Sequence, residues 1–236
     1  MLMIFSILLP MLGAIELFII KDDNKRRFVT AFLVIISAVV ATVAAVTSGG
    51  QVFTLLRISP TLSLSFAADK LSLFFIVLVS LIWCFVQFHA FGYMPHEGGE
   101  NRFFGFFTLT YSALIALALA ANAVTMYMCF ELMTLFSMPL VLHNGSEVSR
   151  AASLKYLGYS TLGAALALMG FFLFSLNAAS LEFVPGGVEL GGNSALLLVS
   201  CFLIVLGFGA NCEVLEPEWL RKELIVTINS LRDKYQ

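Results

Sequence analysis

Glu131 is the residue whose type and position best fit a chemical role. It stands near the middle of an apolar run from Ala123 to Leu142. A charged side chain near the centre of a bilayer costs about 2.5–3.5 kcal/mol on insertion scales, so it must face other helices, water or a partner. A glutamate that is buried among helices with a lysine nearby can exchange a proton at neutral pH. The alternative is a protonated glutamate that only links two helices by hydrogen bonds.

Hydroxyl groups accompany this glutamate on the same side of the predicted helix. Tyr127 lies four residues before Glu131 and Thr134 lies three residues after it, which places the three on one helical face. Together with hydroxyls of the preceding apolar run, they could line a chain of water molecules. Those further hydroxyls belong to Thr108, Tyr111 and Ser112. The alternative is that each hydroxyl bonds to a backbone carbonyl and joins neighbouring helices.

Two further ionisable residues lie near the ends of the predicted spans. Lys155 lies about one turn inside the next apolar run, from which it either reaches the cytoplasmic surface or tunes the protonation of an inner carboxylate. His143 follows the run that contains Glu131, and it either relays protons near neutral pH or caps the helix. His143 lies about 18 Å from Glu131 along a helix, so water or other groups would have to connect them.

The composition places these residues in a membrane. The hydrophobic fraction is 60% and the charged fraction is 12%, whereas a soluble domain is about half apolar and a quarter charged. The net charge of -2 excludes the basic surface of a nucleic-acid-binding protein. The four cysteines form no CxxC pair, and we expect them to be reduced packing residues. No metal cluster, phosphate loop or nucleophile triad is apparent, and we expect no cofactor and no bound metal.

Seven apolar runs approach the length of about 20 residues that crosses a bilayer. A charged or polar loop, or a tight turn near Asn122, separates each run from the next. The predicted fold is therefore an all-α integral membrane protein with about seven transmembrane helices. The runs are Leu2 to Ile20, Phe28 to Val46, Leu71 to Gly92, Phe103 to Ala121, Ala123 to Leu142, Leu154 to Leu176, and Ser194 to Ala210.

Two segments outside these runs have patterns of their own. Val52 to Leu56 and Leu62 to Phe66 are strand-like, with Pro60 between them, which predicts a short hairpin. Pro217 to Gln236 has apolar residues at helical spacing among charged ones, which predicts an amphipathic helix on the membrane surface. A tail without function is the alternative for this last segment.

The positions of lysine and arginine predict the orientation. With seven spans, eleven of these cations fall on one side, and the other side holds Arg57 and Lys70. Cytoplasmic loops carry the excess of positive charge. We therefore expect the N-terminus outside, the C-terminus in the cytoplasm and the hairpin on the extracytoplasmic side of a prokaryotic plasma membrane.

The stretch from Asp69 to Leu176 resembles a known family. It is similar to the proton-translocating, antiporter-like subunits shared by respiratory complex I, membrane-bound hydrogenases and Mrp-type cation/proton antiporters. Four short pieces carry the match in order, and Leu8 to Gly13 fits the first helix of the family. The four pieces are Ala67 to Ser72, Asn101 to Phe104, Asn122 with Phe130 to Ser137, and Arg150 to Leu157.

The resemblance implies a mechanism and also a departure from it. Glu131 falls on a buried family glutamate that exchanges protons with buried lysines. The family has a lysine after a Gly-Phe-Gly-Ala sequence in its seventh helix, and here Asn211 takes that position. Family members have about fourteen helices in two inverted repeats. We therefore expect three segments: an N-terminal two-helix part with a hairpin loop (1–66), an incomplete first repeat (67–210) and an atypical charged tail (211–236).

The leading hypothesis is a truncated or split subunit that takes part in proton or cation/proton translocation. Its expected partners are other membrane subunits of a redox-driven or antiporter complex, the bilayer, and protons or monovalent cations, and not nucleic acid. In a complex I-like assembly it would be a translocase subunit without its own redox centre. One alternative is a structural membrane subunit or remnant that translocates nothing, which Asn211 favours. Another is an unrelated small-solute transporter.

Overall fold

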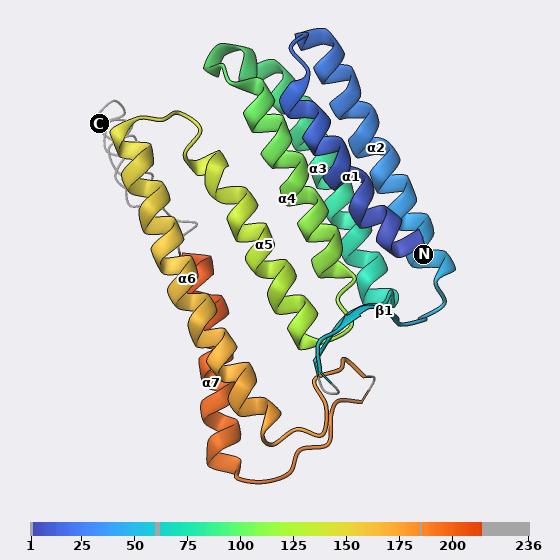
Figure 1. The fold of residues 1–236 in the computed structure, drawn as a ribbon, viewed down its shortest axis with the longest axis vertical. Coiled ribbons are helices and arrows are strands. Elements are labelled where there is room, and N and C mark those ends of the chain that lie inside the picture. The colour runs from blue at the N-terminus through green and yellow to red at the C-terminus, as the bar shows by residue number, and fades with distance from the viewer. Residues whose placement is uncertain (1, 60–61, 185, 214–236) are drawn as a thin grey trace, which may run out of the picture.

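The computed structural model describes residues 2–59, 62–184 and 186–213, with side chains up to Gly209. Within these residues the chain forms seven helices and one two-stranded sheet (Figure 1). The amphipathic helix predicted for Pro217 to Gln236 lies outside the described residues. The elements are α1 (Leu2–Ile19), α2 (Asp23–Thr47), β1 (Phe53–Arg57), β2 (Ser63–Phe66), α3 (Lys70–Glu97), α4 (Glu100–Ala118), α5 (Ala123–Val141), α6 (Glu147–Ser175) and α7 (Ser194–Glu213).

The helices have the length and apolarity of a membrane protein. Within the described residues, α1, α2, α3, α5 and α6 are long and apolar enough to cross a bilayer. The apolar part of α7 is shorter, and α4 begins with the polar sequence Glu100-Asn101-Arg102. A helix satisfies its backbone hydrogen bonds internally, which lipid requires. The chain is therefore an all-α membrane protein, and the count of seven spans remains a prediction.

The helices form two groups that α5 connects (Figure 1). In the first group α1 packs against α2 and α4, and α3 packs against α2 and α4. In the second group α6 and α7 lie side by side. Helix α5 contacts α4 on one side and α6 on the other, so it lies between the two groups.

Two glycines separate α3 from α4. The apolar runs predict spans that end at Gly92 and begin again at Phe103. In the structure α3 continues through Pro95 to Glu97, and α4 begins at Glu100. Gly98 and Gly99 have φ angles of 75° and 64°, a region that favours glycine. These two residues therefore suffice to reverse the chain direction. The sequence pattern did not predict so short a connection.

The sheet is tied to the start of α5. Strands β1 and β2 pair antiparallel. The Ser65 backbone N–H donates to the Thr125 hydroxyl at 2.9 Å, and the Asn122 side chain donates to the Ser63 carbonyl at 3.0 Å. Asn122 also caps α5, because its side-chain oxygen Oδ1 accepts a hydrogen bond from the Thr125 backbone N–H at 2.8 Å. These bonds fix the end of α5 that leads to Glu131.

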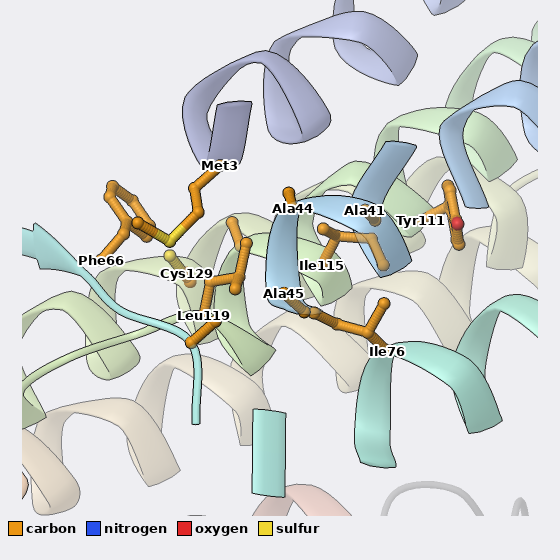
Figure 2. Packing of buried hydrophobic residues seen from close by; sticks show 12 residues of the cluster. Met3, Ala41, Ala44, Ala45, Phe66, Ile76, Tyr111, Ile115, Leu119 and Cys129 are labelled. Carbon is orange, nitrogen blue, oxygen red and sulfur yellow. The ribbon is translucent and has the colours of Figure 1, made fainter. Parts of the chain in front are cut away.

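An apolar core joins α1 to α5 near the sheet (Figure 2). In the close-up Met3 lies beside Phe66 and Cys129, while Ile76 lies beside small residues of α2. These small residues, Ala41 and Ala44, are fully buried, so the helix backbones approach closely there.

A buried ion network lies at the opposite end of the first group. The Arg26 guanidinium, whose side chain is 3% exposed, donates to the Glu100 carboxylate at 2.7 Å and to Asp23 at 2.6 Å. Arg27 donates to the same glutamate at 3.0 Å. Arg26 also donates to Asn101, whose amide in turn donates to the carbonyl of Ile20. The network therefore joins the end of α1 to the starts of α2 and α4.

Removing one partner of this network should destabilise the protein strongly. Breaking a buried ion pair typically costs about 3–5 kcal/mol because it leaves a buried charge uncompensated. We expect Arg26→Met to lower the free energy of unfolding by about 3 kcal/mol in detergent. The double variant Arg26→Met/Glu100→Leu should regain part of that loss. Lys25→Met, at an exposed neighbouring residue, is the control, and an equal effect of Lys25→Met and Arg26→Met would contradict the assignment.

Asp69 begins α3 as an N-cap. Its carboxylate accepts hydrogen bonds from the Ser72 backbone N–H at 2.7 Å and from the Ser72 hydroxyl at 2.8 Å. The backbone hydrogen bond from Ser72 stabilises the charged form and lowers the pKa of Asp69 below its usual value. A carboxyl with a lowered folded-state pKa adds stability above its unfolded pKa of about 3.9, and this stability is lost as the pH falls through the folded pKa.

Substitution of this cap should therefore have a pH-dependent effect. We expect Asp69→Ala to lower the free energy of unfolding by about 1 kcal/mol at neutral pH. The difference from the unmodified chain should shrink as the pH is lowered below about 4, because the carboxylate becomes protonated. Asp69→Asn keeps a capping oxygen and serves as the control. A difference that stays constant down to the lowest pH measured would refute the ionised cap.

Candidate functional site

Glu131 lies in the middle of α5, as the ninth of its 19 residues. The residue is half-buried, and its carboxyl oxygen Oε1 is buried without a hydrogen-bond partner among the described residues. Leu132 and Leu135 occupy the exposed side of the helix, at 42% and 54% exposure. Leu132 lies about 100° around α5 from Glu131, whereas Leu135 lies one turn along the same face. Glu131 therefore stands at the border between the exposed and the covered sides of α5.

Contacts on both sides of Glu131 show that this part of α5 faces α6. One turn before it, the Tyr127 ring packs edge-on against Phe171, with ring centroids 6.4 Å apart. After it, the Ser137 and Tyr156 hydroxyls form a hydrogen bond of 2.7 Å. Along α5, Glu131 therefore lies between two contacts with α6.

Helix α7 contacts α5 at the residue before Glu131. Phe208 of α7 packs edge-on against Phe130, with ring centroids 4.9 Å apart. A Cβ atom at Gly207 would lie 2.5 Å from the Gly163 carbonyl oxygen and 2.6 Å from the Ala167 backbone nitrogen. Gly163 and Ala167, which are four residues apart on α6, therefore form a small-residue contact surface for α7.

The hydroxyls near the glutamate mostly bridge helices or bond to backbone. Thr134 is buried, and its hydroxyl donates to the Glu131 backbone carbonyl at 2.8 Å, not to the carboxylate. Tyr111 pairs with Ser80 of α3 at 2.8 Å, and Ser112 donates to the Ile7 carbonyl of α1 at 2.8 Å. The hydroxyls of α4 thus turn toward α3 and α1, and they do not extend the polar face of α5 as expected.

Lys155 and His143 lie at the end of the bundle away from the sheet. Lys155 is exposed on α6, and it takes part in none of the ion pairs found among the described residues. The His143 ring nitrogen Nε2 is 2.9 Å from the Gly98 carbonyl oxygen, and Arg102 donates to the His143 carbonyl. His143 therefore ties the end of α5 to the turn between α3 and α4, which fits the helix-end interpretation.

Ser160 is a buried polar residue of α6 that the sequence analysis did not single out. It is 3% exposed on α6, and its hydroxyl is buried without a partner among the described residues. It lies one turn from Tyr156 and between the two α5–α6 contacts that flank Glu131. The four-residue spacing of Tyr156 and Ser160 was a visible signal, since it predicts one polar stripe on α6.

A cavity of about 790 Å³ lies on the sheet side of this region. Its lining is largely apolar and includes Phe75 of α3, Leu117 of α4, Phe130 of α5 and Phe208 of α7. Glu131 is not among the lining residues, although it follows Phe130 directly. The cavity therefore reaches the neighbourhood of the carboxyl group without including it.

Comparison with known families agrees with this arrangement. A model described as "NADH-Ubiquinone oxidoreductase (complex I), chain 5 N-terminus" matches residues 58–104, and a model described as "NADH:quinone oxidoreductase/Mrp antiporter, TM" matches residues 120–216. Together they span more than half of the chain. The chain belongs to the antiporter-like subunit family. It corresponds to the N-terminal part of these proteins. A model described as "WCX domain" also matches residues 203–231, most of which lie outside the described part of the chain.

Individual members of the antiporter-like family are similar over part of their length. NAD(P)H-quinone oxidoreductase subunit 5 from the chloroplast of Zygnema circumcarinatum is 32% identical over 59% of this chain and 21% of that protein. Hydrogenase-4 component B of Escherichia coli (strain K12) is 28% identical over 66% of this chain and 24% of that protein. The matched region is thus about a quarter of the length of these relatives.

A solved structure shares the fold. A chain of the membrane-bound sulfane sulfur reductase, an archaeal respiratory membrane complex, superposes with a TM-score of 0.66 and 16% identity. The match covers 87% of this chain and 43% of that chain. A solved membrane complex therefore contains a chain with the same helical fold over most of the length of this one.

The contact between α6 and α7 predicts the effect of one added methyl group. A Cβ atom at Gly207 would collide with the backbone of α6, whereas a Cβ atom at Gly209 would meet nothing within 4 Å. We expect Gly207→Ala to lower the free energy of unfolding by about 1–3 kcal/mol, as overpacking does. Gly209→Ala, on the same helix, should leave stability equal or higher. If thermal unfolding in detergent ranked the two variants in the opposite order, the close α6–α7 packing would be disproved.

Proposed function

We propose that the chain is a membrane subunit that takes part in proton or cation/proton translocation, with Glu131 as its proton-exchanging group. The observation that carries the proposal is the buried, unpaired Oε1 of Glu131 in the middle of α5. An ionisable group in this place is costly and is retained when it has a function. Membership of the antiporter-like subunit family supports the same assignment.

The proposed exchange uses the groups that face α6. The free carboxyl oxygen can accept a proton or a hydrogen bond, and the unpaired Ser160 hydroxyl can donate one. Tyr127 lies one turn along the same face and would extend this polar line toward the sheet. The Thr134 hydroxyl donates to the Glu131 backbone carbonyl and would stabilise this turn of α5. Water molecules would join these groups, because each hydroxyl reaches only its immediate neighbours.

Lys155 and His143 would act from the end that carries the cations. Lys155 is exposed and would exchange a proton with water near the mouth of the path, or its charge would favour the ionised form of an inner carboxylate. His143 would relay protons only through other groups, because it lies about 18 Å from Glu131 along the helix. Its contacts with Gly98 and Arg102 give it a structural role in any case.

The charge distribution supports an orientation with this end in the cytoplasm. Among the described cations, Arg57 and Lys70 lie toward the sheet. The others lie toward the opposite end of the bundle, where the Arg26–Glu100 network and the Arg102–His143 contact are found. By the positive-inside rule the sheet and the N-terminus then lie outside. This arrangement needs α4 and α7 to cross the bilayer as well, which gives seven spans in a prokaryotic plasma membrane.

The proposed partners are other membrane subunits of a redox-driven or antiporter complex. The chain spans about a quarter of the curated relatives named above, and the remaining helices of such proteins would complete the path. A structural subunit that translocates nothing is the second candidate, and Asn211 in the place of a family lysine favours it.

Replacement of Glu131 separates the two candidates. The full chain would be reconstituted in liposomes that contain a pH-sensitive dye, and a potassium diffusion potential would drive proton movement. We expect a proton flux above that of protein-free liposomes, and we expect Glu131→Gln to reduce the flux to that background because glutamine binds no exchangeable acid proton. Glu16→Gln, at an exposed glutamate of α1, is the control and should keep the flux.

Equal flux in Glu131→Gln and the unmodified chain would contradict the role of the glutamate. A flux that never exceeds the protein-free background would favour the structural subunit.

A further inference from the structure

A second group of unpaired polar side chains is buried between α2, α3 and α4. It comprises the Ser37 hydroxyl, the Trp83 indole N–H, both amide atoms of Gln87 and the Thr108 hydroxyl. Ser37 and Thr108 are 0% exposed and Gln87 is 1% exposed. None of these polar atoms has a hydrogen-bond partner within the described residues. Buried polar groups are normally paired, so this concentration needs an explanation.

Ring contacts between α3 and α4 place three of these groups at neighbouring levels along the two helices. The Trp83 ring stacks on Phe107, with ring centroids 4.3 Å apart, and Phe91 contacts Phe104 with centroids 5.3 Å apart. Gln87 lies midway between Trp83 and Phe91 on α3, one turn from each. Thr108 lies between Phe104 and Tyr111 on α4. Gln87 and Thr108 therefore occupy the same level of two facing helices.

Ser37 joins this level from α2. Helices α2 and α4 start at the same end, where Arg26 pairs with Glu100. Ala41 packs in the same core cluster as Tyr111. Ser37 lies one turn before Ala41, and Thr108 lies one turn before Tyr111. Both hydroxyls therefore lie about one turn from residues of this core cluster, toward the end where α2 and α4 begin.

The two hydroxyls also differ from others in the same helices. The usual partner of a hydroxyl inside a helix is the carbonyl of an earlier turn. Thr30 and Thr42 of α2 and Thr110 of α4 each bond to the carbonyl four residues before. Ser37 and Thr108 form no such bond in the described part of the chain. Their hydroxyl oxygens are therefore available to a ligand.

The chemistry of the group selects the ligand. The indole N–H is a donor only, and the glutamine amide offers both donors and an acceptor. A metal cation cannot accept from N–H groups, whereas water both accepts and donates and needs two to four partners. We propose that this interface is a binding site for internal water, held by Gln87 and Thr108 with Ser37 and Trp83 at its sides. The Ser80–Tyr111 hydrogen bond lies directly beside it.

The sign of a stability change tests the site. If water binds there, Gln87→Met removes its main partner, and the thermal midpoint of the full chain in detergent should fall by several degrees. If the amide is unpaired, methionine removes a buried polar group without a partner, and the midpoint should rise. Leu17→Met, at a fully buried residue of α1, is the matched control for a change of shape alone. An equal or higher midpoint for Gln87→Met, relative to this control, would overturn the proposal.

A direct measurement does not depend on the folding of that variant. The chain has two tryptophans, Trp83 and Trp219, so Trp219→Phe leaves Trp83 alone. After transfer to D₂O, ultraviolet resonance Raman spectra should show that the Trp83 indole N–H exchanges while the protein stays folded. An indole N–H that remains protonated over the lifetime of the sample would contradict a water site.

Discussion

The cost of holding an ionisable carboxyl group in the middle of a transmembrane helix governs the second half of this structure. At about 2.5–3.5 kcal/mol for exposure at the bilayer centre, a carboxyl group on α5 is favoured only where other helices, water or a polar partner cover it. It needs a side of the helix that other helices cover. Contacts with α6 and α7 cover that side, through Tyr127, Phe130 and Ser137.

The rest of the fold positions this covered side. The Asn122 cap and its bonds to β2 fix one end of α5, and His143 fixes the other end to the turn between α3 and α4. The Arg26–Glu100 network holds the first group of helices on which α5 rests. The close α6–α7 contact at Gly207 brings Phe208 against Phe130. A carboxyl group near the bilayer centre therefore depends on contacts at both helix ends.

Much of this architecture could be predicted from apolar runs, because lipid imposes length and apolarity on each span directly. The cap at Asp69, the small face at Gly163 and the place of Glu131 in α5 also follow from local sequence. Pairings between distant helices could not be predicted in this way. Tyr111 turns toward Ser80, and the Arg26–Glu100 pair joins residues 74 positions apart, because helix packing decides which side meets which. The spacing of Tyr156 and Ser160 predicts a polar stripe on α6, but which helix covers that stripe depends on packing.

The central claim is that the Glu131 carboxyl group gains and loses a proton inside the bundle. Infrared difference spectroscopy of the reconstituted chain during a pH jump measures this directly, through the C=O stretching band of a protonated carboxylic acid. The account predicts a band that changes with pH, shifts in D₂O and is absent in Glu131→Gln. A spectrum in which Glu131→Gln retains every pH-dependent carboxyl band of the unmodified chain would contradict it.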